Sequence, residues 1–150
     1  MNYYKETERL ISAYTQLKTY IEIKQNELEE LDYYPSGIGF EKNSRGGEVS
    51  STTENTAINI INKKDKIEKE IKSTTKTLAN LEKALDLLDC LSYEIIKQRY
   101  IEKKQWWEIA YSVHCSERWA KELRRRAIIT ISIALYGEEA MHEHSTPKPK

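Results

Sequence analysis

Residues 92–136 of this 150-residue chain are SYEIIKQRYIEKKQWWEIAYSVHCSERWAKELRRRAIITISIALY. Apolar residues recur at helical spacing in three parts of this stretch, which predicts three helices. The breaks between them are short, and the second is a tight link at His114 and Cys115. A serine hydroxyl placed where Ser116 stands accepts a hydrogen bond from the first turn of a helix. We therefore predict that the third helix begins after Ser116 and stops at Gly137.

The predicted third helix has two unlike sides. Its apolar side carries Ala120, Leu123, Ala127, Ile128, Ile131 and Leu135. Its basic side carries Arg118, Lys121, Arg124 and Arg125. Two helices joined by a tight link, the second of them basic, form a helix-turn-helix, and that second helix fits the major groove of B-DNA. The plainer alternative is an amphipathic helix whose basic side is simply solvated.

Helical spacing assigns Arg118, Lys121 and Arg125 to the exposed face. Glu117 and Glu122 lie in or near the same face, where a carboxylate can accept from cytosine N4 and repels phosphate. Such acidic residues would sharpen sequence specificity. The predicted DNA-binding residues are Ser116, Glu117, Arg118, Lys121, Glu122, Arg124 and Arg125.

The formal net charge of zero hides an asymmetry along the chain. Residues 1–91 hold 13 Lys/Arg and 16 Asp/Glu, a net charge of −3, and residues 137–150 hold 2 and 3, a net charge of −1. Residues 92–136 hold 9 and 5, a net charge of +4. The positive charge lies on the predicted helix-turn-helix, as binding to the DNA backbone requires. A charge of +4 is modest, which is one reason to expect two copies on DNA.

Composition indicates an all-α protein built of long helices. Charged residues make up 32% of the chain and apolar residues 39%, with three prolines and five glycines. No run approaches the roughly 18 apolar residues of a membrane span, and the N-terminus lacks an apolar signal core. We therefore expect a cytoplasmic protein without membrane contact. Cys90 and Cys115 form no CxxC pattern and are expected to be two reduced thiols.

Residues 3–32 and 54–91 each predict one long helix. Apolar residues in both follow alternating steps of three and four, which is the heptad pattern of a coiled-coil seam. Polar residues interrupt each seam, which is a common way of fixing register and copy number. The predicted oligomerisation residues are Leu10, Tyr14, Leu17, Ile21, Leu28, Ile67, Ile71, Leu78, Leu81 and Leu85.

The segment 33–53 between these helices is rich in glycine and serine and predicts a loop, either a mobile connector or a functional segment. The two helices would then form an antiparallel hairpin over residues 1–91. A two-helix hairpin buries little core, so we predict a homodimer; the alternative is that the seam docks on a partner protein. Ser92 is the predicted N-cap that starts the DNA-binding domain 92–136, and residues 137–150 predict a flexible tail.

Residues 92–135 resemble the fourth region of bacterial sigma factors. The resemblance rests on the segments EIIKQRYIEKKQWWEIA and SERWAKELRRRA, with a serine at the end of the turn, a basic residue at Lys121 and the pair Arg126–Ala127. The order of long helix, Gly/Ser-rich break, long helix and sigma-like unit is similar to the autolysin-regulator-like (ArpU) and RinA-type late transcription regulators of phages and prophages. This resemblance implies a DNA-binding activator of late genes that acts alongside the host RNA polymerase.

The sequence argues against an enzyme. It has no Gly-rich phosphate loop on a strand, no zinc-spaced Cys/His set and no positioned nucleophile for His114, so we expect no catalytic residues, no metal and no cofactor. Three functions stay open. The first is a dimeric, sequence-specific transcription regulator that binds double-stranded DNA, the second is a small terminase subunit that recognises packaging DNA, and the third is an interaction module that binds RNA polymerase.

Overall fold

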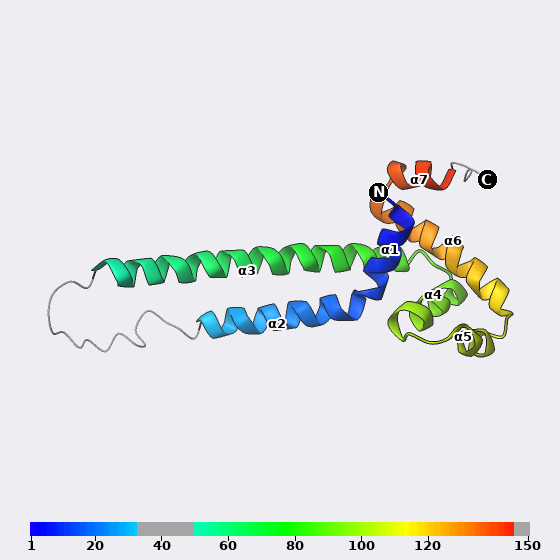
Figure 1. Ribbon diagram of the computed structural model, residues 1–150, viewed down its shortest axis with the longest axis horizontal. Coiled ribbons are helices and arrows are strands. Elements are labelled where there is room, and N and C mark those ends of the chain that lie inside the picture. The colour runs from blue at the N-terminus through cyan, green and yellow to red at the C-terminus, as the bar shows by residue number, and fades with distance from the viewer. Residues whose placement is uncertain (33–49, 146–150) are drawn as a thin grey trace. The chain divides into compact units, whose positions relative to one another are not determined.

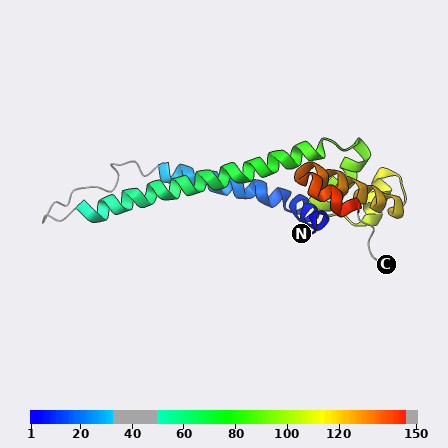
Figure 2. The ribbon, with the colours of Figure 1, turned by 90° about the horizontal axis from the view of Figure 1, so that it is seen from above.

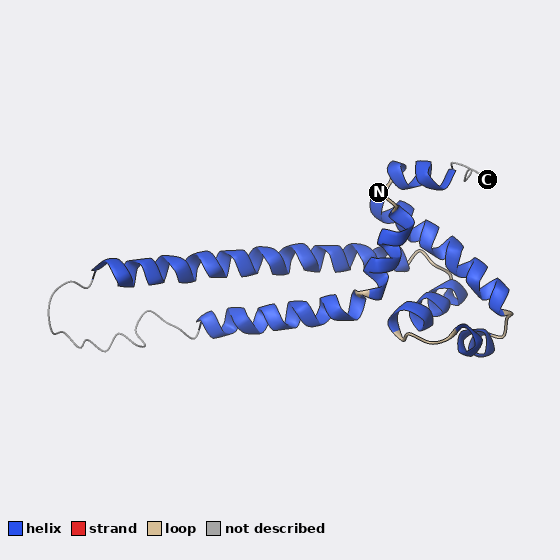
Figure 3. Ribbon diagram, in the orientation of Figure 1, coloured by secondary structure: helices blue, strands red, loops and turns tan. Residues whose placement is uncertain are grey.

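The computed structural model describes residues 1–32 and 50–145, and that part of the chain is helical, without a strand (Figures 1 and 3). The predicted all-α class is therefore confirmed. The helices are α1 (Tyr3–Ser12), α2 (Tyr14–Asp32), α3 (Ser50–Leu85), α4 (Cys90–Ile96), the π-helix η1 (Lys97–Ile101), α5 (Trp106–Val113), α6 (Glu117–Tyr136) and α7 (Glu138–Ser145). Of the predicted loop 33–53, residues 33–49 lie outside the described residues, and α3 begins at Ser50 rather than at residue 54.

The chain divides into two units. One is Lys18–Lys76, and the other joins Met1–Leu17 to Thr77–Lys150. We call the second the C-terminal unit, although it includes the first helix of the chain. The last turns of α3 and the whole of α1 thus pack with the C-terminal helices, whereas the sequence assigned residues 1–91 to the hairpin as a whole.

The unit Lys18–Lys76 is a pair of antiparallel helices, as predicted, and both views show α2 and α3 running alongside each other in opposite directions (Figures 1 and 2). Polar contacts fix their register. Tyr20 donates to Glu70 over 3.2 Å, and Lys64 lies 2.8 Å from Asp32. Among the side chains described in this unit, Ile67 alone is buried, so the pair encloses very little core.

The single helix predicted over residues 3–32 is wrong, because α1 ends at Ser12 and α2 begins at Tyr14. Ala13 has a non-helical backbone, and the Ser12 carbonyl accepts a 3.2 Å hydrogen bond from Lys103. Ile11, just before the break, is fully buried in the core of the C-terminal unit. The break therefore lets α1 change direction and pack against that core. The heptad pattern of the sequence does not indicate this packing.

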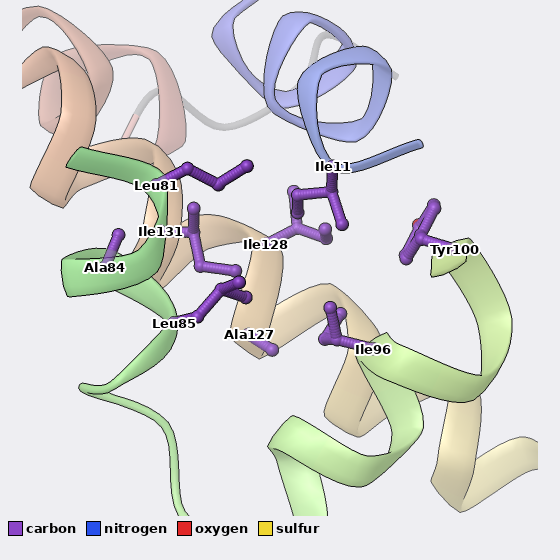
Figure 4. Packing of buried hydrophobic residues seen from close by; sticks show 9 residues of the cluster. All are labelled: Ile11, Leu81, Ala84, Leu85, Ile96, Tyr100, Ala127, Ile128 and Ile131. Carbon is purple, nitrogen blue, oxygen red and sulfur yellow. The ribbon is translucent and has the colours of Figure 1, made fainter. Parts of the chain in front are cut away.

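The core of the C-terminal unit draws side chains from four parts of the chain (Figure 4). Figure 4 shows them pointing toward one another from α1, the end of α3, the α4–η1 segment and α6. Apolar burial of this kind is the main favourable term in folding, at roughly 25 cal/mol per Å² removed from water. The cluster consists of Ile11, Leu81, Ala84, Leu85, Ile96, Tyr100, Ala127, Ile128 and Ile131.

The start of the C-terminal helices differs from the prediction by three residues. The helix α3 ends at Leu85, and α4 begins at Cys90. Asp89 caps α4, because its carboxylate accepts a 3.0 Å hydrogen bond from the Ser92 N–H. Hydrogen bonding from the Ser92 side chain, together with this N–H bond, lowers the pKa of Asp89. The predicted N-cap at Ser92 is thus wrong, although Ser92 is the residue that donates to the cap.

The predicted tail also differs, because residues 138–145 form the helix α7. Gly137 does end α6, as predicted, and its φ of 68° is a backbone conformation that favours glycine. Ala140 on α7 is fully buried, and Glu143 accepts hydrogen bonds from the Tyr3 and Tyr4 N–H groups at 2.8 and 3.3 Å. Glu143 therefore caps the first turn of α1, a partner about 140 residues away in sequence.

Within the described ranges, no helix combines the length and apolar character that crossing a membrane requires. The same residues contain no group of three or more His, Cys, Asp or Glu side chains placed to hold a metal ion. Cys90 and Cys115 are both free thiols.

Candidate nucleic-acid interface

The helices α5 and α6 are joined by a three-residue turn at residues 114–116. His114 ends α5 in the left-handed conformation, with φ 57° and ψ 45°. Ser116 then caps α6 by accepting a 3.1 Å hydrogen bond from the Trp119 N–H, as predicted. At the other end of α5, the Gln105 N–H donates to Glu108 in a capping box. The starts of α5 and α6 are thus both fixed by local side-chain contacts.

A small apolar cluster holds α4, α5 and α6 together. Ile95 and Ile109 are fully buried, and they pack with Ala120 and Leu123 of α6. Since Ala120 is small, α5 can approach the first turns of α6 closely. The opposite side of α6 is left exposed to solvent.

An open groove runs along the N-terminal half of α6. It is lined by Ser116, Arg118, Trp119, Lys121, Glu122, Arg124 and Arg125. Six of the seven predicted DNA-binding residues are therefore brought together, while Glu117 is exposed but does not line the groove. Trp119, which is 43% exposed, is the residue that the predicted set lacked. We call Arg118, Lys121, Glu122 and Arg125 the outward face of α6.

Charges on the outward face are partly paired with one another. Glu122 accepts two hydrogen bonds from Arg125, at 2.8 and 3.1 Å, and one from Arg126 at 3.1 Å. These bonds lower the pKa of Glu122 to about 2, so its carboxylate is ionised at neutral pH. Arg118 and Lys121, in contrast, are exposed and form no ion pair within the described part of the chain.

Arg124 lies at the inner edge of α6 and not on its exposed side. Its guanidinium is 3.5 Å from Glu8 on α1, and it lies 5.3 Å from the centre of the Trp106 ring. Tyr100 donates a 2.6 Å hydrogen bond to the same Glu8 oxygen. Burial, together with this bond, raises the pKa of Tyr100 well above its ordinary value. Arg124 therefore joins α6 to α1 as well as lining the groove.

The adjacent tryptophans of α5 differ in how far they are exposed to solvent. Trp106 is partly buried, whereas Trp107 is 65% exposed. The cationic groups of Arg99 and Lys121 lie 4.9 and 5.8 Å from the centre of the Trp106 ring. Arg99 belongs to the π-helix η1, and no local pattern in the sequence marks it as a neighbour of Lys121.

Trp119 and Arg126 form a second contact that the sequence patterns do not reveal. The Arg126 guanidinium lies 5.2 Å from the centre of the Trp119 ring, on the outside of α6. The two residues are seven positions apart, a spacing that brings side chains to the same side of a helix two turns apart.

The ten predicted oligomerisation residues fall into two groups. Ile67, Leu78, Leu81 and Leu85 are buried within the chain itself. The others are half-buried: Leu10, Tyr14, Leu17, Ile21, Leu28 and Ile71. Ile23, Ile58 and Ile61, which the seam did not include, are each more than half exposed on α2 and α3.

Comparison with known proteins gives a family but no function. A family model described as "Protein of unknown function (DUF722)" matches residues 3–132, from the start of α1 into α6. No curated protein matches the chain, and no solved structure does. Because the family match covers most of the chain, the protein belongs to the DUF722 family.

Proposed function

We propose that this protein is a sequence-specific transcription regulator that binds double-stranded DNA with α6 in the major groove. The observation that carries the proposal is the exposure of two cations, Arg118 and Lys121, directly after the Ser116 cap. Residues near the start of such a helix reach base edges, and arginine can form two hydrogen bonds with guanine. The +4 charge of residues 92–136 adds attraction to the DNA backbone.

Glu122 supports specific rather than general DNA binding. It neutralises part of the charge of Arg125 and Arg126 and holds the Arg125 guanidinium at a fixed place on the outward face. A carboxylate there disfavours close approach of phosphate, and it can accept a hydrogen bond from cytosine. A helix that bound DNA only through charge would not need this residue.

We further propose that the protein acts as a homodimer. The unit Lys18–Lys76 buries one described side chain, Ile67, and leaves Ile23, Ile58 and Ile61 exposed. Two helices with so little core gain stability when a second pair covers them. Light scattering tests this directly, since about two copies are expected, whereas a ring of roughly eight or more copies would favour a small terminase subunit instead.

The order of the segments supports a more specific role. Long helices followed by a sigma-like helix-turn-helix resemble the late regulators of the ArpU and RinA type, so the proposed targets are late phage or prophage genes. The protein would activate them alongside the host RNA polymerase.

Fluorescence anisotropy against DNA duplexes tiled across the neighbouring promoters tests the function. One duplex should bind more tightly than the rest, and its affinity should fall as salt rises. A triple alanine variant at Arg118, Lys121 and Arg125 should lose that preference. The matched control removes the same charge from exposed lysines of α3: Lys66, Lys69 and Lys72. Equal effects of the two variants would refute the role of the outward face.

A protein-binding role is the second candidate, because two aromatic side chains on α5 are largely exposed to solvent. Trp107 is 65% exposed and Tyr111 is 83% exposed, and their spacing of four residues places them on one side of the helix. Exposed aromatic pairs of this kind are typical of interaction sites. A double Trp107→Ala/Tyr111→Ala variant should then lose co-purification with RNA polymerase while Arg118→Ala retains it.

A further inference from the structure

Three cationic side chains surround the indole of Trp106. The guanidinium groups of Arg99 and Arg124 lie 4.9 and 5.3 Å from the ring centre, and the Lys121 ammonium lies 5.8 Å away. Each distance is within the range of a cation–π contact. The ring attracts each cation, but the three cations repel one another. An anion bound beside them would relieve this repulsion.

Among the described residues, carboxylates balance only part of this charge. Glu8 is the one carboxylate with an ion pair to the cluster within the described residues, and it lies 3.5 Å from Arg124. Arg99 donates to a neutral group, the Lys104 carbonyl, at 3.0 Å. Lys121 has no ion-pair partner in the same part of the chain. The Arg99 and Lys121 side of the ring therefore keeps its positive charge.

The cluster lies at the part of a helix-turn-helix that faces the DNA backbone in a complex. Trp106 is the first residue of α5, and Lys121 follows the Ser116 cap by little more than one turn of α6. In a helix-turn-helix, the second helix enters the major groove while the first crosses the sugar-phosphate backbone. Arg99 reaches the ring from a π-helical turn, a rare conformation that often occurs at functional sites.

We propose that Arg99, Lys121 and Arg124, arranged around Trp106, form a binding site for one backbone phosphate of DNA. This inference rests on the proposed function and refines it. It assigns Lys121 and Arg124 to the backbone instead of the base edges, and it adds Arg99, which no sequence pattern indicated. Base contacts are then left to Arg118, Glu122 and Arg125 on the outward face.

The salt dependence of DNA binding distinguishes a phosphate contact from a contact that only holds α5 against α6. Removing one phosphate contact lowers the slope of log affinity against log salt by about 0.9. Because Lys121 and Arg124 still face the phosphate, Arg99→Ala should lower the slope by up to that amount and weaken every duplex by the same factor. Arg99→Lys, which keeps the charge, should restore most of the slope. Lys97→Ala is the control, because Lys97 carries the same charge two positions away, beside Glu102 and off the Trp106 ring.

Anisotropy on the full-length protein, with the promoter tiles and an unrelated duplex, separates the outcomes. If one tile binds best and Arg99→Ala alone lowers the slope, both proposals stand. If one tile binds best but Arg99→Ala and Lys97→Ala behave alike, the phosphate site is refuted and the proposed function stands. If all duplexes bind equally and Arg99→Ala still lowers the slope, the phosphate site stands and sequence-specific regulation is refuted. If no duplex binds, both are refuted.

Discussion

The Tyr100 hydroxyl donates a 2.6 Å hydrogen bond to Glu8 Oε1, and this bond joins η1 to α1 across 92 positions of sequence. The same oxygen lies 3.5 Å from Arg124 of α6. One carboxylate thus ties the first helix of the chain to the helix that carries the outward face. The position of α1 and the orientation of α6 are therefore coupled through Glu8.

Tyr100→Phe should lower the free energy of unfolding by about 1–2 kcal/mol, because it removes a hydrogen bond to a charged acceptor in a mostly buried place. Urea unfolding followed by tryptophan fluorescence measures this, since all three tryptophans lie in the C-terminal unit. Tyr93→Phe is the control, because Tyr93 is 41% exposed. An equal, small effect of both changes would show that the Glu8 bond contributes nothing to stability.

Glu143→Ala should destabilise the docking of α7 on α1. The change removes the acceptor for the Tyr3 and Tyr4 N–H groups, and removal of an N-terminal cap costs about 1 kcal/mol. Partial burial opposes ionisation of Glu143, yet the two N–H bonds outweigh it and lower the pKa. Hydrogen exchange at the first amides of α1 should become faster, whereas Glu138→Ala, on the exposed start of α7, should leave them unchanged.

Glu122→Gln should increase general DNA affinity and reduce sequence preference. The variant releases Arg125 and Arg126 from their shared carboxylate, so both cations become available to phosphates. Anisotropy against the best tile and an unrelated duplex gives the ratio of affinities, which should fall. A ratio that stays constant or rises would contradict the role assigned to Glu122.

The same carboxylate predicts a pH dependence of stability. The folded pKa of Glu122 is about 2, below its ordinary value of 4.5. A group with a lowered folded pKa stabilises the protein above its unfolded pKa and loses that contribution as the pH falls through the folded pKa. The difference in unfolding free energy between wild type and Glu122→Gln should therefore be constant near neutral pH and shrink between about 4.5 and about 2. A difference that grows on acidification would contradict the ion pairing.

Local signals in the sequence were sufficient to predict the helix-turn-helix formed by α5 and α6. Ser116 and Gly137 mark the two ends of α6 because each acts through its own backbone and near neighbours. The apolar spacing of Ala120, Leu123 and Ala127 identifies the buried side for the same reason. Nearly the whole predicted DNA-binding set could thus be placed on one groove without long-range information.

Contacts between distant segments could not be predicted in this way. The break at Ala13 depends on Ile11 joining a core made with α3 and α6, and α7 depends on the start of α1. Leu81 and Leu85 continue the heptad pattern of α3, but their partners include Ile128 and Ile131 of α6. Arg99 meets Trp106 and Lys121 only once η1 and α6 have folded. Each of these features joins residues whose separation in sequence hides the relationship.

The most direct test of the central claim is the binding of wild type and Arg118→Ala to the tiled duplexes at two salt concentrations. Arg9→Ala is the matched control, since Arg9 is an exposed arginine on α1. A bidentate base contact contributes about 1–3 kcal/mol of discrimination, so Arg118→Ala should lower the preference for the best tile by about tenfold or more. The ranking of affinities among the tiled duplexes should also change for Arg118→Ala, while Arg9→Ala should bind like wild type. An Arg118→Ala variant that keeps the wild-type preference would contradict the claim that the start of α6 recognises DNA sequence.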